Sequence, residues 1–178
     1  MFDHFVSQLP IAAASHKIEN RFHKNESSMI IACGSEAGTT MVFAKALLEV
    51  VITQGIKAHL IEMNAYESFP AMRHLLLLTS THGVGGAPFN ALKFIEKFRM
   101  IGTPQSIKYS VVGFGSKKYR TFCQYAETLS FLMKSTDRCT EWIPLTKVSD
   151  QSPKDFGLWY LQFSARLEGQ LSLGFDYQ

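Results

Sequence analysis

The sequence predicts an α/β protein built on a doubly wound, five-stranded parallel sheet with the strand order 2-1-3-4-5. Short apolar runs alternate with helical stretches of roughly 10–15 residues, which is the pattern of strands joined by crossover helices. One run contains four consecutive leucines, Leu75 to Leu78, which is typical of a strand covered by helices on both faces. Glycine-bearing loops directly follow three of the runs. Together these observations favour a sheet with a ligand site at one edge.

The first half of the chain contains three predicted strands and one helix. Residues 29–33 form an apolar run, and the Ala- and Leu-rich stretch from Gly38 to about Thr53 follows as a helix. Gly55 ends this helix because glycine readily adopts the left-handed conformation found after helix ends. Residues 58–63 are the second strand, and residues 73–80, with the four leucines, are the third and central one.

The second half alternates in the same way. A helix is predicted from about Phe89 to Met100, and a strand follows over residues 108–114, where Tyr and Val favour extended structure. The next helix runs from about Thr121 to Lys134. Residues 139–145 form the fifth strand, and an amphipathic helix runs from Lys154 to about Glu168.

The 178 residues are enough for one domain. We expect an N-terminal extension or linker over residues 1–27, the α/β domain over residues 28–169 and a short tail over residues 170–178. The first segment has no regular period and contains Pro10 and the small-residue run Ala12 to Ser15. Such composition places it outside the core.

The composition excludes several classes of protein. Hydrophobic residues make up 46% of the chain, yet no apolar stretch approaches the roughly 20 residues that span a bilayer, and the N-terminus lacks the pattern of a secretory signal. We therefore expect a cytoplasmic protein, or a cytoplasm-facing domain of a larger one. Cys33, Cys123 and Cys139 have neither disulfide-framework nor zinc spacing, and the histidines show no metal spacing. The mild net charge of +3 gives nucleic-acid binding little support.

The loops after the first, third and fourth predicted strands open on the same edge of a parallel sheet and flank one crevice, which is where such sheets bind ligands. The first loop, residues 35–40, joins a strand to a helix and is rich in Ser, Gly and Thr. Because a helix start has unpaired N–H groups and partial positive charge, this loop is suited to cradle a phosphate. One such loop is weak evidence, but three in order are stronger.

Each loop follows a recognisable pattern. Residues 35–39 fit Ser-x-Thr-Gly-Thr except for Ala37, which stands where a threonine is usual. Residues 80–91 fit Ser-Thr-aromatic-Gly-x-Gly-x-x-Pro-x-Asn-Ala, with His82 at the aromatic position. Residues 112–123 are similar to a Phe-Gly-x-Gly loop that ends in Tyr-x-x-Phe-Cys, with Tyr119 as its tyrosine. With these patterns the chain resembles the flavodoxin-type FMN domains, in particular those of diflavin reductases such as cytochrome P450 reductase and the sulfite reductase flavoprotein.

The resemblance implies an FMN site with a phosphate cradle in the first loop and two aromatic walls, Tyr119 and His82, against the flavin ring. It also implies that the Gly83 carbonyl turns to accept the N5–H of one-electron-reduced flavin, a peptide rotation that glycine tolerates. The residues so assigned are Ser35, Glu36, Ala37, Gly38, Thr39, Thr40, Ser80, Thr81, His82, Gly83, Gly85, Gly113, Phe114, Gly115, Lys117, Tyr119, Phe122, Cys123 and Asp150.

By the same resemblance, the chain is an electron carrier, or the FMN domain of a larger NADPH-dependent flavoprotein oxidoreductase. Its donor would be an NAD(P)H/FAD reductase module, and its acceptor a haem or another redox centre. Two alternatives stay open. Ala37 and His82 are compatible with an interaction module that has lost FMN, and a two-electron NAD(P)H:quinone reductase occurs on the same fold.

The charges beside Tyr119 depart from the family. Flavodoxin-like domains usually surround the flavin ring with carboxylates, whereas here Lys117, Lys118 and Arg120 lie beside Tyr119 and the second loop has no acidic residue. Positive charge stabilises anionic, fully reduced flavin. We therefore expect a less negative potential for full reduction than in acidic flavodoxins, and docking of acidic partners.

Overall fold

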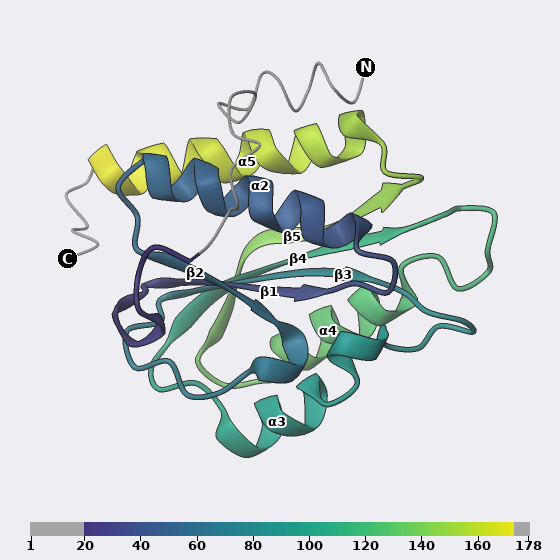
Figure 1. Ribbon diagram of the computed structural model, residues 1–178, viewed down its shortest axis with the longest axis horizontal. Helices are drawn as coiled ribbons and strands as arrows, with labels where there is room; N and C mark the ends of the chain where they lie inside the picture. Colours follow the sequence, from purple (N-terminus) through teal and green to yellow (C-terminus); the bar gives the residue numbers. More distant parts are fainter. Residues whose placement is uncertain (1–19, 173–178) are drawn as a thin grey trace.

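A computed structural model describes residues 20–172 and contains a five-stranded, all-parallel sheet in the order β2-β1-β3-β4-β5 (Figure 1). The fold class and strand order predicted from the sequence are confirmed. The strands are β1 (Met29–Gly34), β2 (Ala58–Glu62), β3 (His74–Ser80), β4 (Ile107–Gly115) and β5 (Cys139–Ser149).

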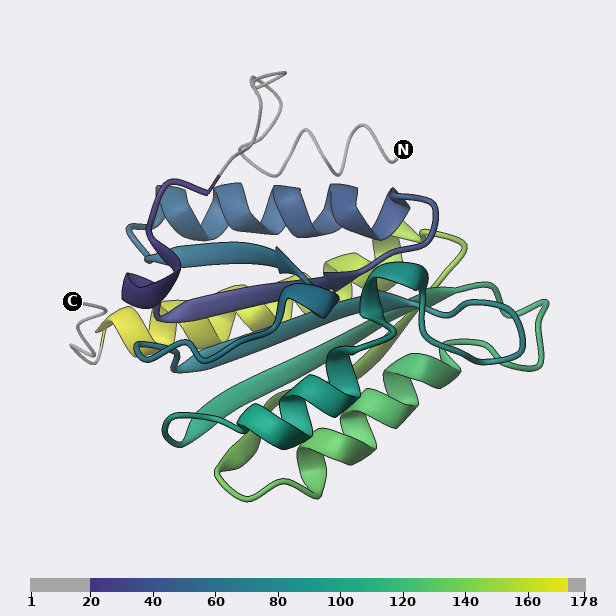
Figure 2. The ribbon, with the colours of Figure 1, turned by 60° about the horizontal axis from the view of Figure 1, so that its bottom comes forward.

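Helices cover both faces of the sheet. Figures 1 and 2 show α2 and α5 on one face and α3 and α4 on the other. The helices are α2 (Thr39–Thr53), α3 (Phe94–Ile101), α4 (Gln124–Lys134) and α5 (Pro153–Ser172), with short 3-10 helices η1 (Lys24–Glu26), η2 (Met63–Ala65) and η3 (Phe89–Ala91). The carboxyl ends of the strands, and the loops that follow them, gather at the right of Figure 1.

The central strand β3 divides two hydrophobic cores. Leu76 and Leu78 pack on the side of α2 and α5, whereas Leu75 and Leu77 pack on the side of α3 and α4. All four leucines are fully buried, as the apolar run predicted. This two-sided burial makes the sheet a rigid platform for the loops at its edge.

Two elements differ from the prediction in ways that shape the site. The helix expected from Phe89 is interrupted, because η3 ends at Ala91 and α3 begins only at Phe94. The fifth strand continues past Leu145 to Ser149, with two register shifts against β4. The longer β5 runs alongside β4 to its end, where Ser149 pairs with Gly115, so the residue after Ser149 lies at the edge where the loops gather.

The segment before the sheet lies along the edge strand β2. The Asn20 amide donates to the Leu60 carbonyl and accepts from the Leu60 N–H, at 2.9 and 2.7 Å, as a neighbouring strand would. Arg21 pairs with Glu49 of α2 at 3.0 Å. Residues 1–19 and 173–178 lie outside the described residues, so the predicted extension (residues 1–27) and tail (residues 170–178) remain predictions.

Among the helices of residues 20–172, none combines the length and apolarity that a membrane crossing requires. The same residues contain no cluster of His, Cys, Asp or Glu side chains able to hold a metal ion.

Candidate functional site

The first loop connects β1 to α2 and leaves the helix start without a side-chain cap. Gly38 occupies the N-cap in the left-handed conformation, with φ of 82°, which a residue with a side chain rarely adopts. Because no side chain accepts the first N–H groups of α2, these donors stay available to an anion, and the helix dipole favours negative charge there. The loop therefore has the chemistry of a phosphate cradle.

Two buried hydroxyls beside this helix start have no hydrogen-bond partner within the described part of the chain. They are the Oγ of Ser35 and the Oγ1 of Thr40, in residues only 8% and 1% exposed. A buried hydroxyl without a partner costs about 1–3 kcal/mol. A bound anion that accepted from both would remove this cost.

The second loop closes into a small hairpin. His82 and Gly86 exchange two backbone hydrogen bonds of 2.9 Å, and Val84 at the tip is 94% exposed. Gly85, with φ of 103°, sits so close to α4 that a Cβ there would lie 2.2 Å from the Gln124 Oε1. Gly85 therefore allows this loop to pack tightly against α4.

Side chains tie the first and second loops together. The Glu36 Oε2 accepts a 2.8 Å hydrogen bond from the Phe89 N–H, and its Oε1 lies 3.6 Å from the His82 Nδ1. The Asn90 Oδ1 accepts from the Ser35 N–H at 2.7 Å. The His82 ring is thus close to the phosphate-cradle loop, and its role as a flavin wall stays a prediction.

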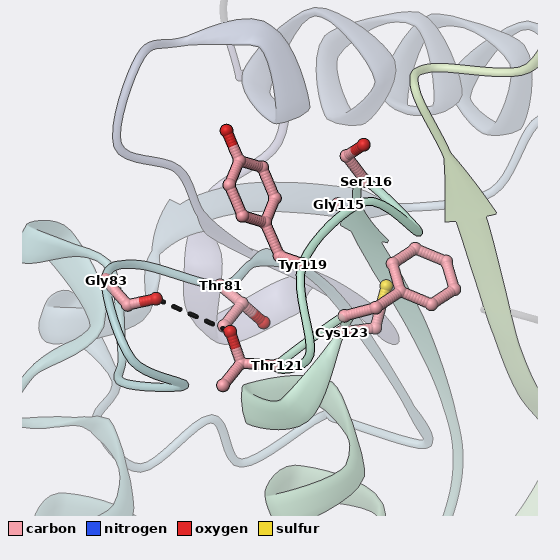
Figure 3. Close-up of a pocket in the computed structure, with 8 residues that line it drawn as sticks. Thr81, Gly83, Gly115, Ser116, Tyr119, Thr121 and Cys123 are labelled. Atoms are coloured by element: carbon pink, nitrogen blue, oxygen red, sulfur yellow. Dashed lines mark hydrogen bonds between the residues drawn. The ribbon is translucent and has the colours of Figure 1, made fainter.

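A cavity of about 300 Å³ lies between the second and third loops (Figure 3). Tyr119, 70% exposed, stands beside it. In Figure 3 the Thr121 hydroxyl and the Gly83 carbonyl face each other across 3.5 Å. The residues that line the cavity are Thr81, Gly83, Gly115, Ser116, Tyr119, Thr121, Phe122 and Cys123.

Asp150, immediately after β5, joins this edge. Its N–H donates to the Gly115 carbonyl at 2.7 Å, and its carboxylate accepts from the Ser149 hydroxyl at 2.8 Å. Hydrogen bonds from Ser116 and Ser149, with a contribution from the charges of Lys118 and Lys117, hold the pKa of Asp150 below its ordinary value. Asp150 is therefore an anion at neutral pH.

Two predicted site residues of β4, Phe114 and Gly113, face the interior of the protein. Phe114 packs against Phe43 with ring centroids 4.8 Å apart, because its place in β4 faces α2 and α5. Gly113 faces α4, where a Cβ would lie 2.6 Å from the Cβ of Ala126. The Phe114 side chain therefore packs in the core and does not line the cavity, and its role in cofactor binding stays a prediction. Gly113 serves close packing between β4 and α4.

Two further predicted residues have structural partners at the cavity. The Thr81 hydroxyl accepts from the Tyr125 N–H at 3.2 Å, which caps the start of α4 where Cys123 provides no side-chain cap. Burial raises the pKa of the Cys123 thiol to about 12, so it is a neutral wall residue at physiological pH.

Sequence reasoning missed four polar residues that organise the site. Asn90 orients the first loop, Ser116 and Thr121 line the cavity, and the Ser149 hydroxyl accepts from the Lys117 N–H at 3.3 Å. Asn90, Ser116 and Thr121 lie inside the loop patterns quoted above, so the patterns contained a signal for them. Ser149 gave none, because the predicted strand ended before it.

Comparison with protein families matches residues 31–137 to the flavodoxin family. Among curated proteins, the sulfite reductase [NADPH] flavoprotein alpha-component of Photobacterium profundum is 32% identical over 111 residues, which cover 60% of this chain and 18% of that protein. The same component of Shewanella oneidensis is 36% identical over 101 residues, which cover 54% and 17%. The chain thus corresponds to less than a fifth of the length of these relatives.

Among solved structures, a flavodoxin variant from Pseudomonas aeruginosa superposes with a TM-score of 0.67 at 22% identity, covering 79% of this chain and 98% of that one. A Streptococcus flavodoxin gives 0.65 at 19% identity, covering 78% and 98%. At this level of identity, the likeness establishes the fold.

Proposed function

Because the chain belongs to the flavodoxin family, whose cofactor is FMN, we propose that it passes single electrons from an NAD(P)H/FAD reductase module to a haem or another redox acceptor. The proposal places this activity in the cytoplasm, or on a cytoplasm-facing domain of a longer protein. When bound, the flavin supplies the redox chemistry, and the protein sets its position, its exposure and its potential.

The observation that carries the proposal is the pair of unpartnered hydroxyls at the uncapped start of α2. Ser35 and Thr40 offer O–H donors there, and the first-turn N–H groups of α2 offer more. A phosphate monoester carries close to two negative charges at neutral pH and accepts several hydrogen bonds, so it suits this donor set. The cradle fits the phosphate end of FMN.

The roles of the other residues follow from their positions. Tyr119 and the cavity beside it would hold the flavin ring, and the exposure of Tyr119 leaves one side of this region open to a partner. Asp150 and Ser116 supply polar groups at the rim. Glu36 keeps the first and second loops in register through Phe89.

The direct test is reconstitution with FMN. The full chain, incubated with FMN and desalted, should keep the visible absorbance of bound flavin, and stepwise photoreduction should resolve two one-electron steps. A protein that returns colourless from desalting would contradict the proposal and support the interaction-module alternative. A single two-electron step would support the quinone reductase alternative.

A pair of variants tests the cradle itself. Thr40→Val removes a hydroxyl that has no partner in the FMN-free protein, so it should not lower the free energy of unfolding of that protein. It should raise the Kd for FMN by about 10- to 100-fold, as loss of a hydrogen bond to a charged group does. Thr53→Val, at the other end of α2, is the matched control and should leave the Kd unchanged. Equal Kd values for both variants would show that the Thr40 hydroxyl does not bind FMN.

A further inference from the structure

We propose that the redox partner of this protein presents a carboxylate-rich surface around a small apolar centre, and that it docks on a cationic rim formed by Lys117, Lys118 and Arg120. This inference rests on the proposed function, since it names the partner class of the same site. The evidence for it is the set of charged and apolar side chains that the loops expose at the carboxyl edge of the sheet.

The charges of the two loops that flank the cavity have a single sign. Residues 80–88 and 115–123 contain no Asp or Glu, whereas all three rim cations lie on the third loop and are exposed. Within residues 20–172, no rim cation has a carboxylate oxygen within 4.0 Å. A partner that approaches these loops therefore meets unpaired positive charge.

Three carboxylates near this edge accept hydrogen bonds from the protein, and one of them, Asp155, accepts from the Ser149 N–H at 3.2 Å. Glu36 accepts from the Phe89 N–H, and Asp150 accepts from Ser149 and Ser116. Glu36 and Asp150 are exposed, so they offset part of the positive charge at this edge. The three cations nonetheless extend from one exposed loop that contains no acidic residue, so the positive charge is concentrated on the third loop.

Apolar groups stand beside the cationic rim. Val84 forms the tip of the second loop and Tyr119 lies within the third, and both are among the most exposed large apolar side chains of the described chain. Protein interfaces commonly have an apolar or aromatic centre within a polar rim, and Tyr and Arg are enriched in them. The complementary surface is therefore apolar at its centre and acidic around it.

The charge of the partner can be tested with two forms of one electron acceptor. Cytochrome c is basic, and its succinylated form, in which lysines are converted to carboxylates, is acidic. The FMN-loaded chain is fully reduced by light, and stopped-flow absorbance follows transfer of one electron from the flavin to the ferric haem, which becomes ferrous. At low ionic strength the succinylated form should react about tenfold faster than at high ionic strength, and native cytochrome c should show the opposite trend.

The variant Lys118→Glu/Arg120→Glu tests whether the cationic rim causes this preference. It should slow reduction of the succinylated form by about tenfold or more at low ionic strength and speed reduction of native cytochrome c. The matched control, Arg73→Glu/Lys108→Glu, makes the same change in net charge at the opposite edge of the sheet, just before β3 and at the start of β4. It should keep the wild-type order of rates. Midpoint potentials of each variant, measured in parallel, correct the rates for driving force.

The inference would be overturned if native cytochrome c reacted faster with the wild-type protein at low than at high ionic strength. Equal effects of the two double variants on the rates would also overturn it. These results are distinct from failure of the proposed function. If no FMN is retained, the visible absorbance recorded before any kinetics reveals it.

Discussion

At the scale of single residues, Ala37 tests how completely the first loop serves a phosphate. It is exposed and lies between Glu36 and the left-handed Gly38, where the family pattern has a hydroxyl. Ala37→Thr should lower the Kd for FMN by about tenfold, because it adds a hydrogen bond to a charged group. Ala37→Val has nearly the same shape without the hydroxyl and should not improve binding. Calorimetric titration of FMN separates the two, and equal affinities would contradict the prediction.

Gly85 is the residue whose replacement the second loop tolerates least. A Cβ at this position meets the Gln124 side chain, and the φ of 103° is itself unfavourable for other residues. Gly85→Ala should lower the free energy of unfolding by about 1–3 kcal/mol, measured by urea denaturation. Gly83→Ala is the control, since its φ is also positive, at 54°, but its Cβ would meet nothing within 4 Å. A similar loss in both variants would show that the positive φ, and not the approach to α4, is responsible.

At the scale of elements, the proposed function gives the third loop control of the electrostatic environment of the flavin. Lys117→Glu/Lys118→Glu should lower the midpoint potential of full reduction by on the order of 50 mV, because two nearby positive charges that favour the anionic form become negative. Spectroelectrochemical titration at low salt measures the change. Lys57→Glu/Lys108→Glu, at the other edge of the sheet, should change it much less. An unchanged midpoint potential in Lys117→Glu/Lys118→Glu would contradict the prediction.

The elements also show which features could be read from local sequence. The leucines of β3 are a short-range signal, and the structure places them as expected. The three loop patterns are also short-range signals, and all three loops lie at the carboxyl edge of the sheet. The break between η3 and α3 could not be read, because apolar residues continue through it at helical spacing. The contact of Glu36 with Phe89 could not be predicted either, because it joins residues 53 positions apart and depends on how two loops meet in space. The burial of the Phe114 side chain could not be read for a related reason, since its face depends on the packing of β4 between two helix layers.

At the scale of the whole molecule, buried thiols couple stability to alkaline pH. Desolvation raises the pKa of Cys33 and of Cys123 to about 12, whereas a thiol in the unfolded chain titrates near ~8.5. The native state therefore keeps protons that the unfolded chain loses. The resulting stability is fully present below pH ~8.5 and is lost progressively as the pH rises toward about 12, by roughly 2 kcal/mol per thiol at pH ~10.

Urea denaturation at several pH values between 7 and 10 measures this slope. Cys33→Ala should flatten it, because the variant lacks one of the thiol protons that the native state retains, although its stability at neutral pH falls as well. The same burial predicts that thiol reagents label Cys33 only after unfolding at pH 8. Rapid labelling of native Cys33, or an unchanged slope in the variant, would contradict the assignment.

The contact of Asn20 with Leu60 has a consequence for how copies of this molecule meet. An exposed edge strand is a template on which another chain can add a strand. At β2, the Asn20 amide already occupies both backbone groups of Leu60. At the opposite edge, β5 contains Pro144, which has no N–H to offer, and two register shifts that disturb its ladder. Polymerisation through strand addition is therefore obstructed at both edge strands of the sheet. The loops at the carboxyl edge remain available for contacts with other molecules.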